Sequence, residues 1–595
     1  MRYALILFLA TGLSWTLRAA EAASDRLHKV LDQYMEERLK LFPFEATSIG
    51  DPRYNDQFPN SLSDSYRGQQ HAFYQKYLAQ LGQFHRDSLP QSDQLSFDVL
   101  KREMTLGLQE MSLLQGNGGY PVMRHMTINQ FASFPIDFVL YGSGQNKQPF
   151  KTVKDYENWL KRMEGFPRWA DSAISDMKAG LKARVTPARV LMVSVVQQLD
   201  EVANSGAGSG VLYQPLREFP AGIPASERER LKTAYTRALE KKVLPAFRKL
   251  RNFVQNEYLP NCTSTAGISA LPGGRDAYLM LVKHWTTTDT SPDDIHALGL
   301  REVARIRAEM EKAKSDAGFK GSLKEFFDYL RKDPKFYPFK NDEEVLSHYR
   351  GIETRIAPRL KDLFGVTPKS RFEIRATEKF RAATSSAEYM EPSEDGSRPG
   401  IFYVPIPNAK EFSPVRSESL FLHEAIPGHH YQISLQQENK EIPKFRRFLW
   451  YGAFGEGWAL YTESLGKELG VYTDPIQYFG MLSAEMHRAI RLVVDTGIHW
   501  KGWTREQAIR YSLENEGMSE AGVIAEIERY MAIPGQALSY KMGQLKILEL
   551  REKAKRELGA KFSLRNYHDE VLKDGVLPLD VFERKMDRWI AAQKK

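Results

Sequence analysis

The sequence predicts a mainly α-helical protein with one small β-structured segment. Apolar residues recur every three or four positions from residue 23 to about 260 and from 291 to about 364, the pattern of helices with one buried face. Residues 371–406 instead contain two short runs of β-type composition, after which helical periodicity returns. A content of 42% hydrophobic and 27% charged residues is typical of a globular protein.

The first 22 residues are predicted to be a secretory signal peptide. Met1-Arg2-Tyr3 precedes the apolar segment 4–17, and Ala20-Glu21-Ala22 supplies the small residues of a cleavage site. No other stretch has 18 uncharged apolar residues, so we expect no integral membrane segment in the mature chain, residues 23–595. The single cysteine, Cys262, lies far from the cleavage site, which excludes a lipid anchor there and an internal disulfide. We therefore expect a secreted or periplasmic protein that is soluble once the signal peptide is removed.

The distribution of charged residues and the interruptions of the helical pattern indicate how the mature chain is organised. The net charge of +8 is spread over intermixed Lys, Arg, Asp and Glu without a dense basic tract, so no nucleic-acid partner is expected. Leu271-Pro-Gly-Gly274 interrupts the helical pattern and is a candidate lobe boundary. Ser291-Pro-Asp-Asp294 then predicts the start of a long helix, with serine as N-cap and proline in the first turn. The sequence does not define an oligomeric state.

Two β-type runs directly precede the most distinctive part of the chain. Arg371-Phe-Glu-Ile-Arg375 alternates in polarity, and Gly400-Ile-Phe-Tyr-Val-Pro405 is a short β-type run. A small sheet at this place can offer an edge to which an extended peptide adds as a further strand. A buried structural hairpin is an equally open interpretation.

The segment Ser417–Gln432 concentrates three histidines and a carboxylate beside an apolar run. His423-Glu424 followed by another histidine indicates a zincin-type metal helix, in which two imidazoles bind zinc and the glutamate acts on a water molecule. In a straight helix the second histidine would be too far along the axis, so the backbone must deform at Pro427-Gly428. The second ligand is His429 or His430. The alternative is a solvated, histidine-rich helix end.

A third zinc ligand is expected from another helix, and Glu456 is the best candidate because the glycines beside it allow close backbone approach. Glu463, two turns further along, can accept a hydrogen bond from a ligand histidine. Glu424 is then the predicted general base. The alternative for these acids is a solvated position on a helix surface. The site predicts one zinc ion as cofactor.

Further candidates lie downstream. Arg491, Asp495 and His499 are spaced along one side of an apolar helix, and Tyr540 could donate its hydroxyl to a developing oxyanion, while Arg529 or Lys541 could bind a substrate carboxylate. We take His499 and Tyr540 as candidate catalytic residues and the three cations Arg491, Arg529 and Lys541 as candidate substrate-binding residues. The alternatives are an Arg491–Asp495 ion pair and a core position for Tyr540.

At these residues the sequence resembles a bacterial family known as domain of unknown function 885. The resemblance rests on four ordered motifs, His423–Gln432, Glu456–Glu463, Arg491–His499 and Pro534–Gly543, and on the lead-in Gly396–Tyr403. It covers essentially the whole mature chain. It implies a two-lobed helical, zincin-like fold with a deep central cleft and a small sheet beside the metal helix, similar in outline to gluzincin peptidases of the thimet-oligopeptidase kind.

The resemblance also implies site residues. The ligands would be His423, His429 and Glu456, with Glu424 as base, and His429 is preferred because the family element is Pro-Gly-His. Arg398 and Tyr403 of the lead-in are candidate substrate contacts, and the metal-site region spans about 371–595 of a single two-lobed domain. The predicted function is an exported zinc peptidase acting on short peptides or similar small amides, as a carboxypeptidase or dipeptidase. The alternatives are a periplasmic peptide-binding or scaffold protein without turnover, and a metal-dependent hydrolase of a non-peptide amide or ester.

Overall fold

The chain forms two compact, mainly helical units. The computed structural model describes residues 2–113, 122–144, 147–377, 379, 382, 386–393 and 398–594. One unit comprises Met1–Met280 with Met531–Ile533, and the other comprises Leu281–Tyr530 with Pro534–Lys595. The division between the two units lies shortly after residues 271–274, where the sequence interrupts the helical pattern. Gly396 and Ser397 of the lead-in motif lie outside the described residues.

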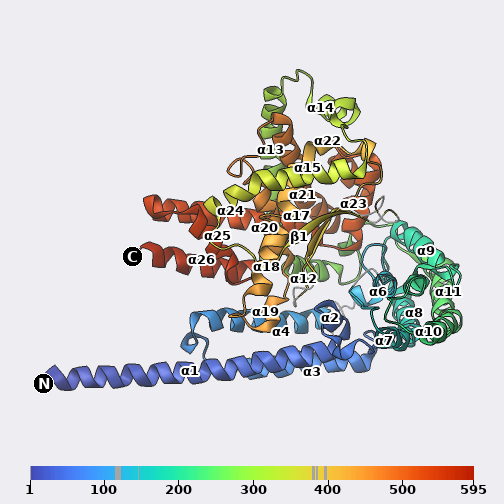
Figure 1. Cartoon of the computed structure of the whole chain (residues 1–595), viewed down its shortest axis with the longest axis horizontal. Coiled ribbons are helices and arrows are strands. Elements are labelled where there is room, and N and C mark those ends of the chain that lie inside the picture. The colour runs from blue at the N-terminus through green and yellow to red at the C-terminus, as the bar shows by residue number, and fades with distance from the viewer. Residues whose placement is uncertain are drawn as a thin grey trace. The chain divides into compact units, whose positions relative to one another are not determined.

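The first unit is built from helices (Figure 1), and its hydrophobic core is rich in aromatic side chains. Its helices are α1 (Arg2–Leu41), α2 (Pro43–Ser48), α3 (Asp64–Leu81), α4 (Gln91–Leu113), α5 (Val122–His125), α6 (Phe134–Gly142), α7 (Val153–Met163), α8 (Phe166–Ala183), α9 (Arg189–Ala203), α10 (Ala225–Ala238) and α11 (Leu244–Phe253). Phe166 stacks on Phe138 of α6 at 4.4 Å between ring centroids and on Phe247 of α11 at 4.5 Å. Such offset aromatic pairs add to the hydrophobic free energy of burying the rings. Helix α12 (Gly274–Thr286) crosses the division between the units.

Helix α1 begins within the segment predicted to be a signal peptide and continues without a break to Leu41. Among the described residues, no helix combines the length and the apolar character needed to cross a membrane.

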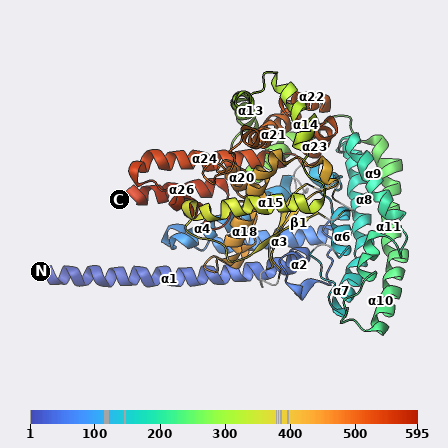
Figure 2. The ribbon, with the colours of Figure 1, turned by 45° about the horizontal axis from the view of Figure 1, so that its top comes forward.

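The second unit contains the candidate site. Its helices are α13 (Pro292–Asp316), α14 (Leu323–Lys332), α15 (Asp342–Ile356), α16 (Leu360–Leu363), α17 (Ser417–Glu424), α18 (His429–Glu438), α19 (Lys444–Arg447), α20 (Gly452–Glu463), α21 (Pro475–His499), α22 (Arg505–Asn515), α23 (Glu520–Ala532), α24 (Ser539–Leu558), α25 (Leu564–Leu572) and α26 (Leu579–Lys594). The predicted start of α13 is confirmed, because the Ser291 hydroxyl accepts a hydrogen bond from the Asp294 N–H at 3.1 Å. Helix α13 packs along α21, and Figure 2 shows their surroundings from a second direction.

The β-structure is one three-stranded sheet in the order β1-β3-β2. Strand β3 (Gly400–Val404) lies between β1 (Phe372–Ala376), to which it is parallel, and β2 (Glu388–Met390), to which it is antiparallel. The two predicted strands are therefore neighbours, but their parallel pairing excludes the hairpin interpretation. β2 was not predicted from the sequence. Phe372 packs on His430 of α18 at 4.7 Å, which places the sheet beside the histidine-rich segment.

Candidate metal centre

The histidine-rich segment forms two helices rather than one bent helix. α17 ends at Glu424, and α18 begins at His429 after residues 425–428, which include a cis peptide bond between Ile426 and Pro427. A side chain has no room at Gly428, because its Cβ would lie 1.9 Å from the His423 carbonyl oxygen. Only glycine allows the chain to pass so close to the end of α17. The backbone thus deforms at Pro427-Gly428 as predicted, and the deformation separates the segment into two helices.

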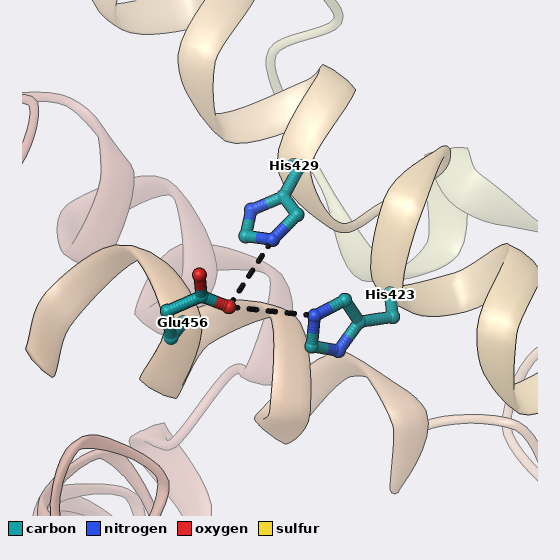
Figure 3. A group of neighbouring side chains, drawn as sticks. All are labelled: His423, His429 and Glu456. Atoms are coloured by element: carbon teal, nitrogen blue, oxygen red, sulfur yellow. Dashed lines mark ion pairs between the residues drawn. The ribbon is translucent and has the colours of Figure 1, made fainter. Parts of the chain in front are cut away.

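This break brings His423, His429 and Glu456 together (Figure 3). The Nε2 atoms of both histidines face the same Glu456 oxygen, Oε2, at 3.5 Å from His423 and 3.4 Å from His429. One ligand atom from each residue lies within 4.8 Å of the other two. Both histidines are buried, and the Glu456 side chain is 19% exposed. Three donors from three helices therefore converge on one point.

Residues of helix α20 itself hold this helix close to the loop between α17 and α18. A Cβ at Gly455 would lie 2.0 Å from the Trp450 ring, and a Cβ at Gly457 would lie 2.5 Å from Gly543 of α24. The glycines on either side of Glu456 thus allow the close approach that the sequence predicted. Trp458 donates its indole N–H to the Pro427 carbonyl at 2.9 Å, which ties α20 directly to the loop between the two histidines.

Glu463 orients the first histidine. Its Oε1 atom lies 2.8 Å from His423 Nδ1, and its Oε2 atom accepts a hydrogen bond from Ser419. The structure thus contains the expected contact between Glu463 and His423, a candidate ligand. A carboxylate that accepts the Nδ1 proton leaves the lone pair on Nε2, the nitrogen that faces Glu456. Sequence reasoning missed Ser419, although its position one turn before His423 on the same helix face is a usable signal.

The charged groups in this buried site shift one another's pKa values. Burial opposes protonation of His423, but the nearby carboxylates of Glu456, Glu463 and Glu424 raise its pKa to about 9. Burial also raises the pKa of Glu424, and the neighbouring histidines oppose that rise. For Glu456 the two histidines outweigh the effect of burial, and its pKa falls far below the usual range. Glu456 is therefore ionised at any physiological pH.

His430 points to a different environment. Its Nδ1 atom lies 2.8 Å from the Tyr389 hydroxyl of β2 and 3.3 Å from the Ser434 hydroxyl, and its ring packs on Phe372. Burial lowers the pKa of His430 to about 4, so the ring is neutral. His430 therefore joins α18 to the sheet, and the converging histidine is His429.

The donor set fits a zinc ion. Nitrogen–oxygen distances of 3.4 and 3.5 Å are too long for charge-assisted hydrogen bonds, which measure about 2.7–2.9 Å. They match the separation of roughly 3.3–3.4 Å between ligand atoms bound at about 2.0–2.1 Å in tetrahedral geometry. Two imidazole nitrogens and one carboxylate oxygen also leave a fourth position for water or substrate, as in catalytic zinc sites.

Two predicted site residues are placed where they cannot contact a substrate directly. His499 is fully buried, its Nε2 atom lies 3.0 Å from the Tyr530 carbonyl, and burial lowers its pKa to about 4. Lys541 is also fully buried and forms ion pairs with Glu485 at 2.6 Å and Glu302 at 3.0 Å. The structure corrects both expectations, because each group is already used to join helices.

Arg491 and Tyr540 contact each other. The Arg491 guanidinium carbon lies 4.6 Å from the Tyr540 ring centroid, and the guanidinium pairs with Glu526 of α23 at 2.9 Å. The partner of Arg491 is thus Glu526, whereas the alternative interpretation paired it with Asp495; the Asp495 carboxylate accepts a hydrogen bond from the Gly535 N–H at 3.1 Å. Tyr540 is 9% exposed, in agreement with the core alternative.

The three remaining candidates are more accessible. Arg529 is 28% exposed and lies 3.6 Å from Glu526. Tyr403 is half-buried on β3, opposite Glu388. Arg398 is half-buried beside β3, and within the described part of the chain its Nη1 atom has no hydrogen-bond partner. Their roles toward a substrate stay predictions.

The fold and this site define a mainly helical protein with a two-histidine, one-carboxylate centre at a helix break. The chain belongs to the family described as bacterial protein of unknown function (DUF885), whose model matches residues 43–586.

Solved structures extend this relationship. A crystal structure described as "the putative lipoprotein from Colwellia psychrerythraea" is 30% identical, with a TM-score of 0.88 over 96% of this chain and 100% of that chain. A "putative lipoprotein of unknown function" from Shewanella oneidensis is 18% identical, with a TM-score of 0.71 over 94% of this chain and 99% of that chain, and shares the fold. No curated protein matches the chain.

Proposed function

We propose that this protein is an exported zinc-dependent peptidase that hydrolyses short peptides. The observation that supports this most strongly is the convergence of His423, His429 and Glu456 within 4.8 Å. When bound there, a zinc ion would acidify a coordinated water toward a pKa of ~7 and polarise a substrate carbonyl. The likeness to gluzincin peptidases, the deep central cleft and removal of the signal peptide before residue 23 are parts of the same proposal.

Glu424 is the proposed general base. It is the last residue of α17, it directly follows His423, and its carboxylate interacts electrostatically with His423, His429 and Glu456. Burial raises its pKa, which makes the carboxylate a stronger base than one in water. It would accept a proton from the attacking water and deliver it to the leaving amine.

Other residues of the chain orient the candidate metal ligands. Glu463 and Ser419 hold the His423 ring, and Trp458 holds the loop that carries His429. Because these contacts are made within the fold, the site requires little rearrangement to bind a metal ion. Tyr540 and Arg491 stay candidates for contacts with the substrate carbonyl or carboxylate.

The alternatives keep the same fold but differ in chemistry. A peptide-binding or scaffold protein without turnover needs no metal, whereas a hydrolase of non-peptide amides or esters needs the metal but rejects peptides. The close agreement of the ligand distances with tetrahedral zinc geometry favours the metal-dependent functions.

Metal analysis and activity together test the proposal. Purified wild-type protein is expected to hold close to one zinc per chain by mass spectrometry, and His423→Ala and Glu456→Ala are expected to lose it. Glu424→Gln should retain zinc but lose activity on a library of short peptides by about 10²–10⁴-fold. A wild type that holds no zinc after zinc is supplied would overturn the proposed chemistry.

A further inference from the structure

One exposed tryptophan lies beside the candidate metal centre. Among the side chains that the structure describes, Trp450 is the only tryptophan or phenylalanine that is exposed, at 44%. It belongs to the loop between α19 and α20, shortly before the candidate ligand Glu456. A single exposed apolar side chain needs no explanation by itself, so the neighbours of Trp450 decide whether it has a role.

The Trp450 ring contacts both helices that supply His429 and Glu456. Its centroid lies 5.8 Å from that of the His429 ring of α18. A Cβ at Gly455 of α20 would lie 2.0 Å from the indole, so the ring rests directly on the backbone next to Glu456. Only glycine leaves room for the ring at this position. Trp450 is therefore held in place against two of the three candidate ligands.

The accessible part of the candidate centre adjoins Trp450. The side chain of His423 is 4% exposed, that of His429 is 10% exposed and that of Glu456 is 19% exposed. The two more accessible ligands are thus His429, which Trp450 contacts, and Glu456, which follows the glycine under the indole ring. A molecule that reaches the centre from solvent through these two ligands therefore passes close to the exposed tryptophan.

The spacing suits a peptide that is bound across the centre. The distance of 5.8 Å between the rings of Trp450 and His429 is shorter than two extended peptide residues, which span about 3.3–3.6 Å each. A peptide bond held at the converging ligands therefore brings the side chain of a flanking residue within reach of the indole. Tryptophan suits such a contact, because its large rigid surface packs well against apolar and aromatic groups.

We propose that Trp450 binds a large apolar side chain of the substrate residue that flanks the cleaved bond. The inference rests on the proposed function, because it assumes that this bond is cleaved at the metal centre. It names the substrate class as short peptides with a large apolar residue, such as phenylalanine, next to the cleaved bond. Trp450 is then a residue that determines specificity and takes no part in proton transfer.

The test compares tetra-alanine with the four tetrapeptides in which one alanine is replaced by phenylalanine. Mass spectrometry of the products formed by the zinc-loaded wild type identifies the cleaved bond. The peptide with phenylalanine next to that bond should be cleaved with a kcat/KM about 10- to 100-fold higher than tetra-alanine. Calorimetric titration of the chelator-treated full chain, in which metal-dependent turnover is blocked, should give the same order of affinities.

Variants of Trp450 separate substrate contact from structural support. Trp450→Ala should reduce the preference for phenylalanine about tenfold while the kcat/KM for tetra-alanine changes little. Trp450→Phe keeps an aromatic ring and should retain most of the preference. As a matched control, Leu300→Ala removes an apolar side chain of the same 44% exposure from α13 and should leave the preference unchanged. Zinc content and thermal melting identify any variant that has lost the metal or the fold.

Three results would overturn the proposal. The wild type shows no preference for phenylalanine beside the cleaved bond in either measurement, or folded Trp450→Ala keeps the full preference. A Trp450 that only supported His429 would affect all peptides alike, so an equal fall in every kcat/KM together with loss of zinc is the third. If Trp450→Ala does not fold, Trp450→Gln, which places a polar side chain over Gly455, takes its place.

The two readouts distinguish failure of this inference from failure of the proposed function. If the zinc-loaded protein cleaves all five peptides at equal rates, the peptidase stands and the role of Trp450 is wrong. If the chain holds no zinc and cleaves nothing, but binds phenylalanine peptides in a way that Trp450→Ala abolishes, the side-chain site stands and the zinc peptidase is wrong.

Discussion

Glu463 holds Nδ1 of His423 at 2.8 Å, while Nε2 of the same ring faces Glu456 at 3.5 Å. The two acids belong to the same helix, α20, and contact opposite edges of one imidazole. One helix therefore supplies both a candidate metal ligand and the group that orients another ligand. This relationship allows the two roles to be separated by mutation.

Replacement of Glu463 should weaken zinc binding without abolishing it. Glu463→Gln keeps the shape of the side chain but removes the charge that fixes the His423 ring, and loss of such a supporting contact typically costs about 10–100-fold in metal affinity. Competition with a chromogenic chelator measures the change. Glu468→Gln, at an exposed position just beyond the same helix, serves as control. An unchanged zinc affinity in Glu463→Gln would contradict the orienting role.

The adjacent histidines should behave differently. His429→Ala is expected to lose zinc because it removes a converging nitrogen. His430→Ala should retain zinc but unfold more easily, by about 1–3 kcal/mol, because it leaves the half-buried Tyr389 hydroxyl without its His430 partner. Metal content and urea unfolding of both variants provide the measurement. Retention of zinc by His429→Ala together with its loss in His430→Ala would reverse the assignment of the ligand.

Close packing at Gly457 should be essential, whereas the glycine at the start of the same helix should not be. A Cβ at Gly457 would lie 2.5 Å from Gly543, so Gly457→Ala forces α20 and α24 apart at a cost of about 1–3 kcal/mol or more. The nearest atom to a Cβ at Gly452 is 3.5 Å away, and Gly452→Ala should be nearly neutral. Chemical denaturation tests both. Equal stabilities would show that the interface relaxes.

Zinc binding should release protons at neutral pH. The pKa of His423 is raised to about 9 in the metal-free protein, so its ring is protonated at pH 7 and must lose a proton to bind the metal. Apparent zinc affinity should therefore rise with pH until it levels off near pH 9. The Glu456 pKa is lowered, so Glu456 is already ionised and adds no proton release in this range.

Calorimetry in buffers with different ionisation enthalpies counts the released protons. An affinity that does not change between pH 6 and 8 would contradict the raised pKa of His423 and the proton release predicted from it. Because a bound metal replaces the proton, the raised pKa of His423 itself should be observed only in the chelator-treated protein.

Much of the architecture follows from local sequence patterns. Helical periodicity predicted the dominant secondary structure, Ser291 and Pro292 predicted the start of α13, and β-type composition predicted β1 and β3. Strand β2 was missed because three residues are too few for a periodic pattern. Pairing of β1 with β3 in parallel was also not predictable, because the composition of two short strands does not reveal their relative direction.

The candidate site was predicted more fully than its surroundings. His423, Glu424, His429 and Glu456 stand in recognisable motifs, because the proposed chemistry would require these side chains at restricted spacings. Lys541 and His499 have equally suitable side chains, but the structure buries them among other groups. Whether a charged residue is available to a ligand depends on neighbours distant in sequence, such as Glu485 and Glu302 around Lys541.

The sequence by itself determined that this chain is mainly helical and that two histidines and an acid flank a Pro-Gly break. These properties depend on residue type and local spacing. Only the tertiary structure decided between His429 and His430 and showed that Lys541 is paired with Glu485 and Glu302. Both depend on the direction in which each side chain leaves its helix and on the groups that packing places there, and neither is determined by local sequence.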